Sequence, residues 1–564
     1  MKSLDWIVLI SSILFIVLYG LWKGRGSKNI QGYLLADRNM RWLPILLSIM
    51  ATQASAITFL SAPGQAYVDG VRFVQFYLGL SIAMVVLSIT AIPIYHKLKV
   101  YTAYEYLENR FDLKTRSLAA LLFLTQRGLA AGLTIYAPSL ILSVLLGWNL
   151  YITNLIIGTL VVSYTTFGGT KAVNWTHLQQ MFIITIGMFL AFFMIIRLLP
   201  SDISLFQAAQ LAGKMGKLNA IDFTFDLGNR YNIWSGIIGG FFLQLSYFGT
   251  DQSQVQRYLT GKSITQSRMA ILLNGIIKIP MQFSILFLGT MLFIFYQFQS
   301  APIFFNSVAV DQIRQSEYAQ EFVQMEEKYE ETLQQKRSAV KNLSISLAEK
   351  NQTKIRENQQ RVEVLQNEAA GIRNDAINLM QKNDPDTDPS DTNYIFLSFV
   401  IKFLPVGVVG LILAVIFAAS MSSTASELNA LASTTVIDIY KRMFRKNASE
   451  RHYLWVSRIA TLLWGVYAIL LAETASRLGS LIEAVNIVGS LFYGTILGIF
   501  LVGFYLKSIR ATSTFIAAII AEVLVFICHF FIDITFLWYN LIGCLGVIGF
   551  ALILQHIFGV KGPR

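Results

Sequence analysis

Long apolar stretches constrain the fold of this chain more than any other feature. Thirteen stretches of about 20 mostly apolar residues recur along the 564 residues, and one helix of that length crosses the hydrocarbon core of a bilayer. Only 14% of the residues are charged, whereas a soluble domain carries roughly 25%. The sequence therefore predicts an all-α polytopic membrane protein with about 13 transmembrane helices, at approximately 5–22, 43–63, 74–95, 117–146, 150–167, 176–197, 233–250, 269–297, 405–437, 452–472, 479–505, 513–532 and 536–558.

The positive charge lies on one side of the predicted membrane. The formal net charge is +12, which would suit nucleic acid if it formed a single patch. With the basic segment 23–29 placed in the cytoplasm, the short cytoplasmic loops hold 23 Lys and Arg and the short outer loops hold 7. This bias predicts a protein of the plasma membrane, typically the bacterial inner membrane, with its N-terminus outside and its C-terminus in the cytoplasm. The lipid bilayer is the expected partner, and nucleic acid is not.

The first apolar stretch and the cysteines add little chemistry. A basic cluster follows residues 5–22 and no A-x-A site appears, so a retained helix is favoured over a signal peptide. The two cysteines, Cys528 and Cys544, fall in separate predicted helices and indicate neither a disulfide framework nor a metal site.

One long segment is polar. Residues 314–391 hold 11 Lys and Arg against 15 Asp and Glu, and apolar residues recur on two heptad lines before 349–354 and on two more after it. This pattern predicts an antiparallel coiled-coil hairpin outside the membrane, with arms about 45 Å long at 1.5 Å per residue. A solvated spacer and a docking arm for an unknown protein partner both suit such a hairpin.

Several predicted spans contain clusters of small, hydroxylic or amide residues, which are costly in lipid and usually face a cavity or one another. Na⁺ prefers oxygen ligands, and freed carbonyls of an unwound helix together with hydroxyls of a neighbouring helix can supply them. Ala51 and Ala54 allow close approach, and Ser422 and Ser423 could supply hydroxyls. The alternative is that these small residues only pack helices together.

Six stretches together resemble the sodium:solute symporter family, whose members include sodium–galactose, sodium–proline and sodium–sialic acid symporters. They are spread over nearly all of the chain outside 314–391. The stretches are ATQASAITFLSAPGQAY (51–67), YTAYEYLENRF (101–111), TFGGTKAVNWTHLQQ (166–180), GTDQSQVQRYLTGK (249–262), AASMSSTASELNALASTTVIDIYKR (418–442) and VNIVGSLFYGTILGIFLVG (485–503).

The resemblance implies a five-plus-five inverted-repeat transporter core. The expected divisions are an extra N-terminal helix and cytoplasmic loop at 1–42, core helices 1–7 at 43–313, the external hairpin at 314–391, core helices 8–10 at 392–506 and two C-terminal helices at 507–564.

The resemblance also implies one Na⁺ site. Its ligands would be carbonyls of the broken first core helix and a carbonyl and two hydroxyls of the eighth, which match Ala51, Ala54, Ala419, Ser422 and Ser423.

A second Na⁺ site, present in some members, is altered here. His177 stands where those members have an aspartate, and only Ser426 remains of the two matching serines because the other position is Ala425. We therefore expect one Na⁺ per transport cycle. Glu427 lies beside Ser426, and one hypothesis pairs His177 with Glu427; in the alternative, Glu427 faces the cytoplasmic vestibule and His177 caps a helix or bonds to backbone. Histidine titrates near neutrality, so proton-linked transport stays open.

By the same resemblance, five positions would surround the solute near mid-membrane: Thr58, Tyr77, Asp251, Lys278 and Asn486. The sugar-binding Gln and Glu of the galactose symporter are replaced by Thr58 and Tyr77. Lys278 suits a carboxylate or a hydroxylated solute, and a conformational lock is an equally good role for it. Arg127, inside the fourth span, is expected to be structural or gating and to pair with backbone.

The sequence thus favours a secondary active symporter, in which the Na⁺ gradient drives import of a small polar organic solute, such as a sugar or a carboxylate, by alternating access. A transporter-derived channel or sensor, with the hairpin as its docking arm, is the alternative. An enzyme is not expected, since the sequence shows no metal cluster and no nucleophile–base arrangement at recognisable spacing.

Overall fold

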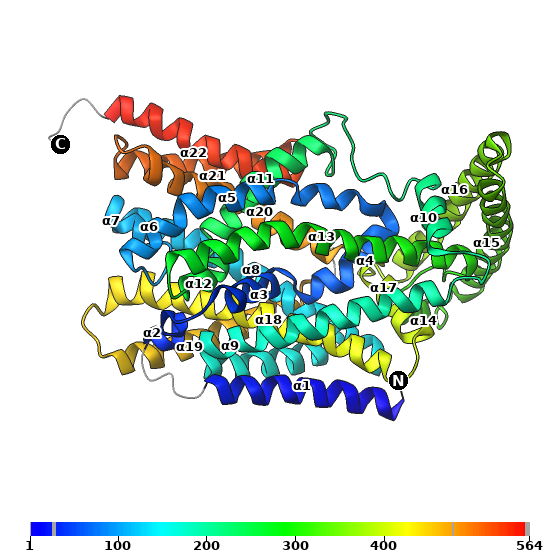
Figure 1. Cartoon of the computed structure of the whole chain (residues 1–564), viewed down its shortest axis with the longest axis horizontal. Helices are drawn as coiled ribbons and strands as arrows, with labels where there is room; N and C mark the ends of the chain where they lie inside the picture. The colour runs from blue at the N-terminus through cyan, green and yellow to red at the C-terminus, as the bar shows by residue number, and fades with distance from the viewer. Residues whose placement is uncertain (1, 25–29, 476–478, 559–564) are drawn as a thin grey trace.

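The computed structural model describes residues 2–24, 30–475 and 479–558, and within them every extended regular element is a helix. Most of the basic segment 23–29 lies outside the described residues. The helices lie roughly side by side along the long axis (Figure 1). Helix α1 (Ser3–Gly24) begins at the end of the molecule that carries α15 and α16, and α22 (Phe536–Phe558) ends at the opposite end.

Nine helices of the described chain are long and apolar enough to cross a membrane, fewer than the thirteen expected. Some expected spans are interrupted and others are merged, and of the expected span at 5–22, which lies in α1, the residues Ser3–Ile16 count as a shorter apolar helix. The span at 43–63 is divided into α3 (Trp42–Gln53) and α4 (Ala56–Asp69). The spans at 150–167 and 176–197 form one continuous helix, α9 (Leu150–Arg197).

The seventh expected span, like the second, is interrupted. It is made of the π-helical turn η3 (Ser235–Gly239) and the ten-residue α11 (Gly240–Gly249), and α12 (Gln252–Leu259) follows a break at Thr250–Asp251. The segment after α4 is a 3₁₀ turn, η2 (Gly70–Tyr77), followed by α5 (Leu80–Ile89) and α6 (Ala91–Leu98).

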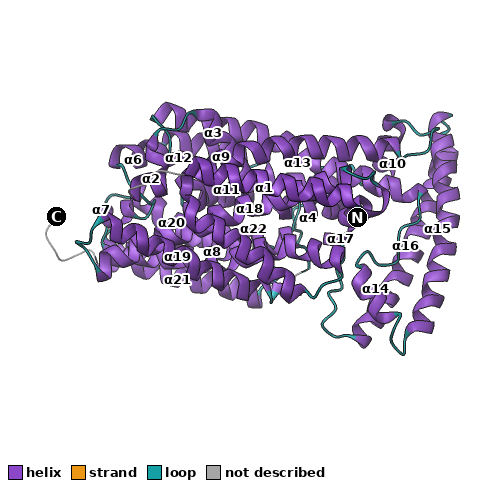
Figure 2. Ribbon diagram, turned by 90° about the horizontal axis from the view of Figure 1, so that it is seen from below, coloured by secondary structure: helices purple, strands orange, loops and turns teal. Residues whose placement is uncertain are grey.

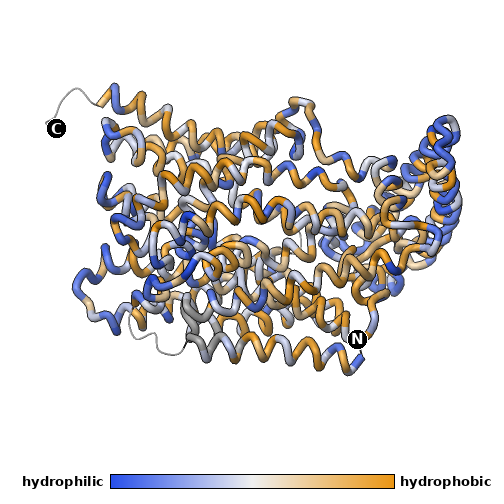
Figure 3. The backbone as a smooth tube through the Cα atoms, in the orientation of Figure 1, coloured by the Kyte–Doolittle hydropathy of each residue, from blue (hydrophilic) through white to orange (hydrophobic). Residues whose placement is uncertain are grey.

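One almost wholly buried helix, α18 (Val408–Thr434), continues into the π-helical η4 (Thr435–Phe444). Almost all of its residues are buried, because it packs against α1, α8 and α9. Orange apolar segments dominate the bundle, and blue segments gather at its ends and on the projecting hairpin (Figure 3). The other long helices are α8 (Leu113–Leu146), α13 (Ile264–Phe298), α19 (Glu450–Ala472), α20 (Leu481–Tyr505) and α21 (Ala511–Phe531).

The polar segment forms two long helices, α15 (Ala319–Ala348) and α16 (Gln352–Asn383), which pack against each other outside the bundle (Figure 2). The heptad positions predicted from the sequence form their shared core: Phe322, Val340 and Leu343 are buried on one arm, and Ile355 and Leu379 on the other. Several short helices lie beside the hairpin or at the ends of the bundle. They are α2 (Ile30–Leu35), η1 (Ala36–Arg38), α7 (Glu105–Arg110), α10 (Leu205–Lys214) and α14 (Ser307–Ile313).

Helix α17 (Thr392–Phe403) closes the hairpin end of the bundle. It packs along α4, and Asn393 joins it to the start of α20 by donating to the Gly479 carbonyl at 2.9 Å and accepting from the Leu481 amide at 3.3 Å. Gly64 makes this packing possible, because a Cβ at that position would overlap the Thr392 carbonyl oxygen.

We expect Gly64→Ala to lower the stability of the protein by about 1–3 kcal/mol, the usual cost of forcing a methyl group into a packed interface. A thermal unfolding measurement in detergent checks this. The matched control is Gly213→Ala, since a Cβ at Gly213 in α10 meets nothing within 4 Å. Equal stability of the two variants would contradict this account of the α4–α17 contact.

Candidate functional site

The break between α3 and α4 lies deep in the bundle. Ala51 and Ala54 are both fully buried, and the helix ends where the Ala54 amide donates to the Met50 carbonyl at 2.7 Å. Carbonyl groups in the last turn of a helix lack the amide donors that a continuous helix would supply. The break therefore presents carbonyl oxygens inside the membrane region.

The hydroxyl segment of α18 runs beside this break. Thr52 on α3 and Ser426 on α18 place their hydroxyl oxygens 3.2 Å apart. Ser423 donates back to its own helix, with the Ala419 and Ser420 carbonyls both at 3.1 Å. The Ser422 hydroxyl is buried and has no hydrogen-bond partner among the described residues. Of the serines expected at the ion site, Ser422 thus has a hydroxyl left for a ligand.

His177 links α9 to both of these helices. Its Nδ1 lies 2.9 Å from the Ser48 hydroxyl of α3, and its Nε2 lies 3.3 Å from the Ser422 carbonyl and 3.4 Å from the Ser426 hydroxyl. Ser48 donates to Asn174 Oδ1 at 2.8 Å, and a neutral imidazole donates either from Nδ1 to Ser48 or from Nε2 to the Ser422 carbonyl, according to its tautomer. The imidazole thus connects α3, α9 and α18 next to the helix break.

Glu427 does not bond to His177, and the expected pairing of these two residues is wrong. The carboxylate of Glu427 accepts instead from Arg127 at 3.1 Å and from the Thr134 hydroxyl at 3.0 Å, both on α8. Ser426 and Glu427 are neighbours on α18, but Ser426 faces Thr52 and His177, whereas Glu427 faces α8. The alternative expectation, that His177 bonds to backbone, agrees with its contact to the Ser422 carbonyl.

Arg127 is the centre of a buried ionic network rather than a partner of backbone, which corrects the expectation from the sequence. Its guanidinium contacts Glu427 of α18 and also Asp251, which caps the start of α12. Tyr493 of α20 accepts from Arg127 at 2.5 Å and donates to Asp251 at 2.8 Å. Four separate elements are joined by three buried charges and one phenol.

A small cavity of about 80 Å³ lies beside this network, at the level of the helix break. Three of the five residues expected around the solute line it: Thr58, Tyr77 and Asn486. Its wall also includes the amides Gln53 and Gln244, whose Oε1 atoms are buried and have no hydrogen-bond partner among the described residues. The cavity thus presents acceptor oxygens and hydroxyls to its contents.

The other two expected residues lie behind the wall of this cavity. Asp251 is engaged by Arg127 and Tyr493 and by its capping bond to the Ser253 amide at 2.8 Å. The Nζ of Lys278 is fully buried, has no hydrogen-bond partner among the described residues and lies 5.7 Å from the centre of the Tyr77 ring. In this structure the Tyr77 ring, which lines the cavity, therefore lies between Lys278 and the cavity.

The sequence interpretation did not include several wall residues: Gln53, Arg127, Thr134, Gln244, Tyr247 and Tyr493. The sequence could have indicated Arg127, because an arginine inside an apolar span needs a buried partner. It could not have indicated the others, because an isolated polar residue in a long helix does not reveal which face meets the cavity.

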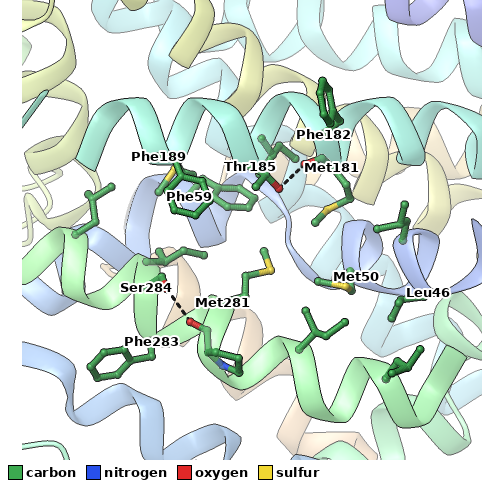
Figure 4. A pocket seen from close by; sticks show the side chains of 18 of the residues that line it. Leu46, Met50, Phe59, Met181, Phe182, Thr185, Phe189, Met281, Phe283 and Ser284 are labelled. Carbon is green, nitrogen blue, oxygen red and sulfur yellow. Dashed lines mark hydrogen bonds between the residues drawn. The ribbon is translucent and has the colours of Figure 1, made fainter. Parts of the chain in front are cut away.

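A much larger cavity, of about 970 Å³, lies between α3, α9 and α13 (Figure 4). Most of its labelled residues are apolar, such as Leu46, Phe182 and Met281, and the polar ones are Thr185 and Ser284. Its hydroxyls are used within their own helices: Thr185 donates to the Met181 carbonyl at 2.7 Å and Ser284 to the Pro280 carbonyl at 2.9 Å. This recess offers no free polar group, so it does not suit a polar solute.

A bundle of membrane-length helices, with interrupted helices meeting at a buried polar site, is the architecture of a secondary transporter. The family is established by a match of residues 33–325 and 384–521 to the model of the sodium:solute symporter family. The chain belongs to this family, and Na⁺ as the coupling ion of the family agrees with the expectation from the sequence. The unmatched interval, 326–383, falls within the hairpin.

Individual relatives are distant, and all of those described here are transporters. The human sodium/iodide cotransporter is 25% identical over 87% of this chain, which spans 64% of its length. The mouse sodium-coupled monocarboxylate transporter 1 is 26% identical over 88% of this chain and 68% of its own. The sodium/sialic acid symporter SiaT of Proteus mirabilis is 24% identical over 98% of this chain and 95% of its own.

A solved structure shows the same fold. It is a Na⁺-coupled sialic acid symporter in a substrate-bound, outward-open state, with a TM-score of 0.75 at 22% identity over 99% of this chain and 98% of that one.

The ionic network yields a prediction about stability. Replacing Arg127 with Gln leaves Glu427 and Asp251 buried without their cation, which we expect to cost about 3–5 kcal/mol. In the double variant R127Q/E427Q one of the uncompensated charges is gone, so its loss should be smaller than the sum of the single losses. Free energies of unfolding from denaturant titration in micelles measure the cycle.

The exposed pair Lys354 and Glu349 in the hairpin, 3.3 Å apart, is the matched control. Its coupling energy should not exceed about 1 kcal/mol. Additive losses for Arg127 and Glu427 would mean that the two groups do not stabilise each other.

Proposed function

We propose that this protein is a secondary active symporter of the plasma membrane that uses the Na⁺ gradient to import a small polar organic solute by alternating access. The observation that carries the proposal is the buried break between α3 and α4 beside the free hydroxyl of Ser422. Unwound carbonyls facing a hydroxyl inside a membrane bundle suit a dehydrated Na⁺.

Five residues would bind the ion. The carbonyl groups of Ala51 and Ala54 come from the break, and the Ala419 carbonyl and the Ser422 and Ser423 hydroxyls come from α18. Ser423 would exchange its bonds to the Ala419 and Ser420 carbonyls for the cation. Burial of all five residues supports the assignment, because a low-dielectric setting strengthens ion–dipole contacts.

One Na⁺ per cycle follows from the place of His177. Its ring lies between Ser48, Ser426 and the Ser422 carbonyl, so it fills the region where an aspartate and a second serine would bind another ion. The ring donates through one of its nitrogens and, unlike a carboxylate, brings no negative charge for a second cation. Ser426 is also used, by Thr52 at 3.2 Å.

The small cavity indicates the chemistry of the solute. The unpartnered Gln53 and Gln244 carbonyl oxygens favour a molecule that donates hydrogen bonds, such as one with hydroxyl or amide groups. Arg127 is already shared by two carboxylates, so the network adds no net positive charge for an anion. Thr58, Tyr77 and Asn486 would contact the solute, with Lys278 supporting the Tyr77 ring.

The closed end of the bundle fits this cycle. Helix α17 bridges α4 and α20 at the hairpin end, which the charge bias places outside. Na⁺ binding at the break would favour the separation of α17 from these two helices. The interrupted first and sixth core helices support a five-plus-five inverted repeat. In this topology residues 314–391 form an external antiparallel coiled-coil hairpin, and the C-terminal helix ends in the cytoplasm.

The cargo can be found with the purified protein. A thermal-shift screen of sugars, polyols, amides and carboxylates, with and without Na⁺, should identify a solute that stabilises the protein only when Na⁺ is present. Uptake of that solute into proteoliposomes should then reach accumulation above its external concentration under an inward Na⁺ gradient. Equilibration without accumulation would indicate a channel and overturn the proposal.

Ser422→Ala should raise the Na⁺ concentration for half-maximal uptake at least about tenfold, which corresponds to about 1.4 kcal/mol of lost ion binding. Ser433→Ala is the matched control, since this buried serine of the same helix bonds only to the Ala430 carbonyl, at 2.9 Å. Na⁺ titration of uptake measures both variants. An unchanged Na⁺ dependence in S422A would remove the serine from the ion site.

The ratio of charge to solute moved should be one positive charge per neutral solute, because one Na⁺ enters with it. Simultaneous current and radiotracer measurements give this ratio. Two charges per solute would show that the region around His177 still binds an ion.

A further inference from the structure

A second polar cavity, of about 370 Å³, lies between the hairpin and the neighbouring ends of the core helices. Val68 at the end of α4 and Phe293 of α13 form its inner wall. Lys336 of α15 and Arg373 of α16 form its outer wall, and Lys217 enters from the loop after α10. It shares no lining residue with the 80 Å³ cavity beside Arg127.

The charges around this cavity are unbalanced. Three cationic side chains and one carboxylate line it, which leaves an excess of two positive charges. The carboxylate, Asp391, is paired with Arg373. The excess therefore belongs to Lys217 and Lys336.

These two ammonium groups have only neutral partners within hydrogen-bond distance. Lys217 donates to the Val68 carbonyl and Lys336 to the side-chain carbonyl of Gln366. Both Nζ atoms lie over the same ring, at 4.5 Å and 5.9 Å from the centre of Phe293. In the described chain neither forms an ion pair with a carboxylate, although Lys336 is only 6% exposed.

Burying a charge without a counter-charge is expensive. Burial lowers the pKa of Lys217 to about 8. Burial also lowers the pKa of Lys336 to about 8, and the positive charge of Lys217 adds to this effect. An anion between them would supply the missing counter-charge, and the aromatic and aliphatic wall would hold an apolar body attached to it.

We propose that this cavity is a binding site for a small organic carboxylate, separate from the transport site, with its carboxylate between Lys217 and Lys336. The apolar part of the ligand lies against Phe293, Tyr296, Leu333 and Ile377, which line the same cavity. The site exists only because the hairpin covers the core at this point.

The ligand would also act on the closure of the bundle. Asp391 lines the cavity, accepts from the Phe305 amide at 2.6 Å and directly precedes α17, the helix that closes the hairpin end. A molecule held between the hairpin and this segment favours the closed arrangement, because opening would separate its two sets of contacts. Binding outside thereby regulates transport without competing for the transport site.

Binding should weaken between pH 7 and pH 9.5. A lysine with a pKa of about 8 is charged below that pH and neutral above it, so the attraction for a carboxylate is lost as the pH rises. The carboxylate of Asp69, at the exposed end of α4, favours the charged form of Lys217. Asp69 also accepts a hydrogen bond from the Gln65 amide. The titratable and charged groups that line the cavity are Tyr67, Lys217, Tyr296, Tyr329, Lys336, Arg373 and Asp391.

The test uses the full-length protein in detergent, with benzoate as the probe and benzamide as its neutral counterpart, in titration calorimetry at pH 7. Wild-type protein should bind benzoate and not benzamide. K336Q and K217Q should each bind benzoate at least tenfold more weakly, and two variants on different elements guard against misfolding of one. K354Q, on the hairpin surface away from the cavity, should bind like wild type.

Other outcomes would overturn the proposal. They are absence of benzoate binding by the wild type, equal binding of benzamide, and retention of benzoate binding in both K336Q and K217Q. Loss of binding in K278Q with retention in K336Q would place benzoate at the transport site instead. Because the probe and the variants differ from those of the uptake experiments, failure here leaves the proposed Na⁺-coupled import untouched.

Discussion

The contact between Arg127 and its two carboxylates is the interaction on which the centre of this bundle depends. A guanidinium at membrane depth is tolerated only with compensating charge, and Asp251 and Glu427 supply it from elements far apart in the sequence. The pairing fixes α8, α12 and α18 relative to one another, with Tyr493 adding α20. The wall of the small cavity and the position of the Ser422 segment both follow from this arrangement.

The interrupted helices impose a second constraint, since an open helix end inside lipid is costly unless protein covers it. Small residues of α18 provide that cover. Ala419, Ser422 and Ala425 keep the helix narrow, so α3 and α4 approach closely enough for Thr52 to reach Ser426. The same small side chains that permit packing leave the Ser422 hydroxyl without a hydrogen-bond partner among the described residues.

Composition and periodicity predicted the helical membrane class, and the heptads predicted the two polar helices and their buried residues such as Phe322 and Val340. The residues that motif resemblance assigns to the ion site lie on α3, at the break after it and on α18, and their role as ligands stays a prediction. The number of uninterrupted spans could not be predicted, because apolar composition does not show where α3 ends or that α9 runs on. Nor could the pairing of Glu427 with Arg127 be found, since partners 300 residues apart leave no local pattern. Asp251 and Lys278 share the cavity's neighbourhood, but side-chain direction separates them from its wall.

The hairpin buries its apolar seam within itself, and the stretch 326–383 lies between the two parts of the chain that match the family model. Its two arms leave and rejoin the core within the same end of the bundle, so the spans on either side keep their spacing (Figure 1). An arm of 30 residues is about 45 Å long, and both arms lie across the end of the bundle rather than along its helices (Figures 1 and 2). This end of the bundle is therefore covered by a second layer of helices, which a chain made only of the segments that match the family model would lack.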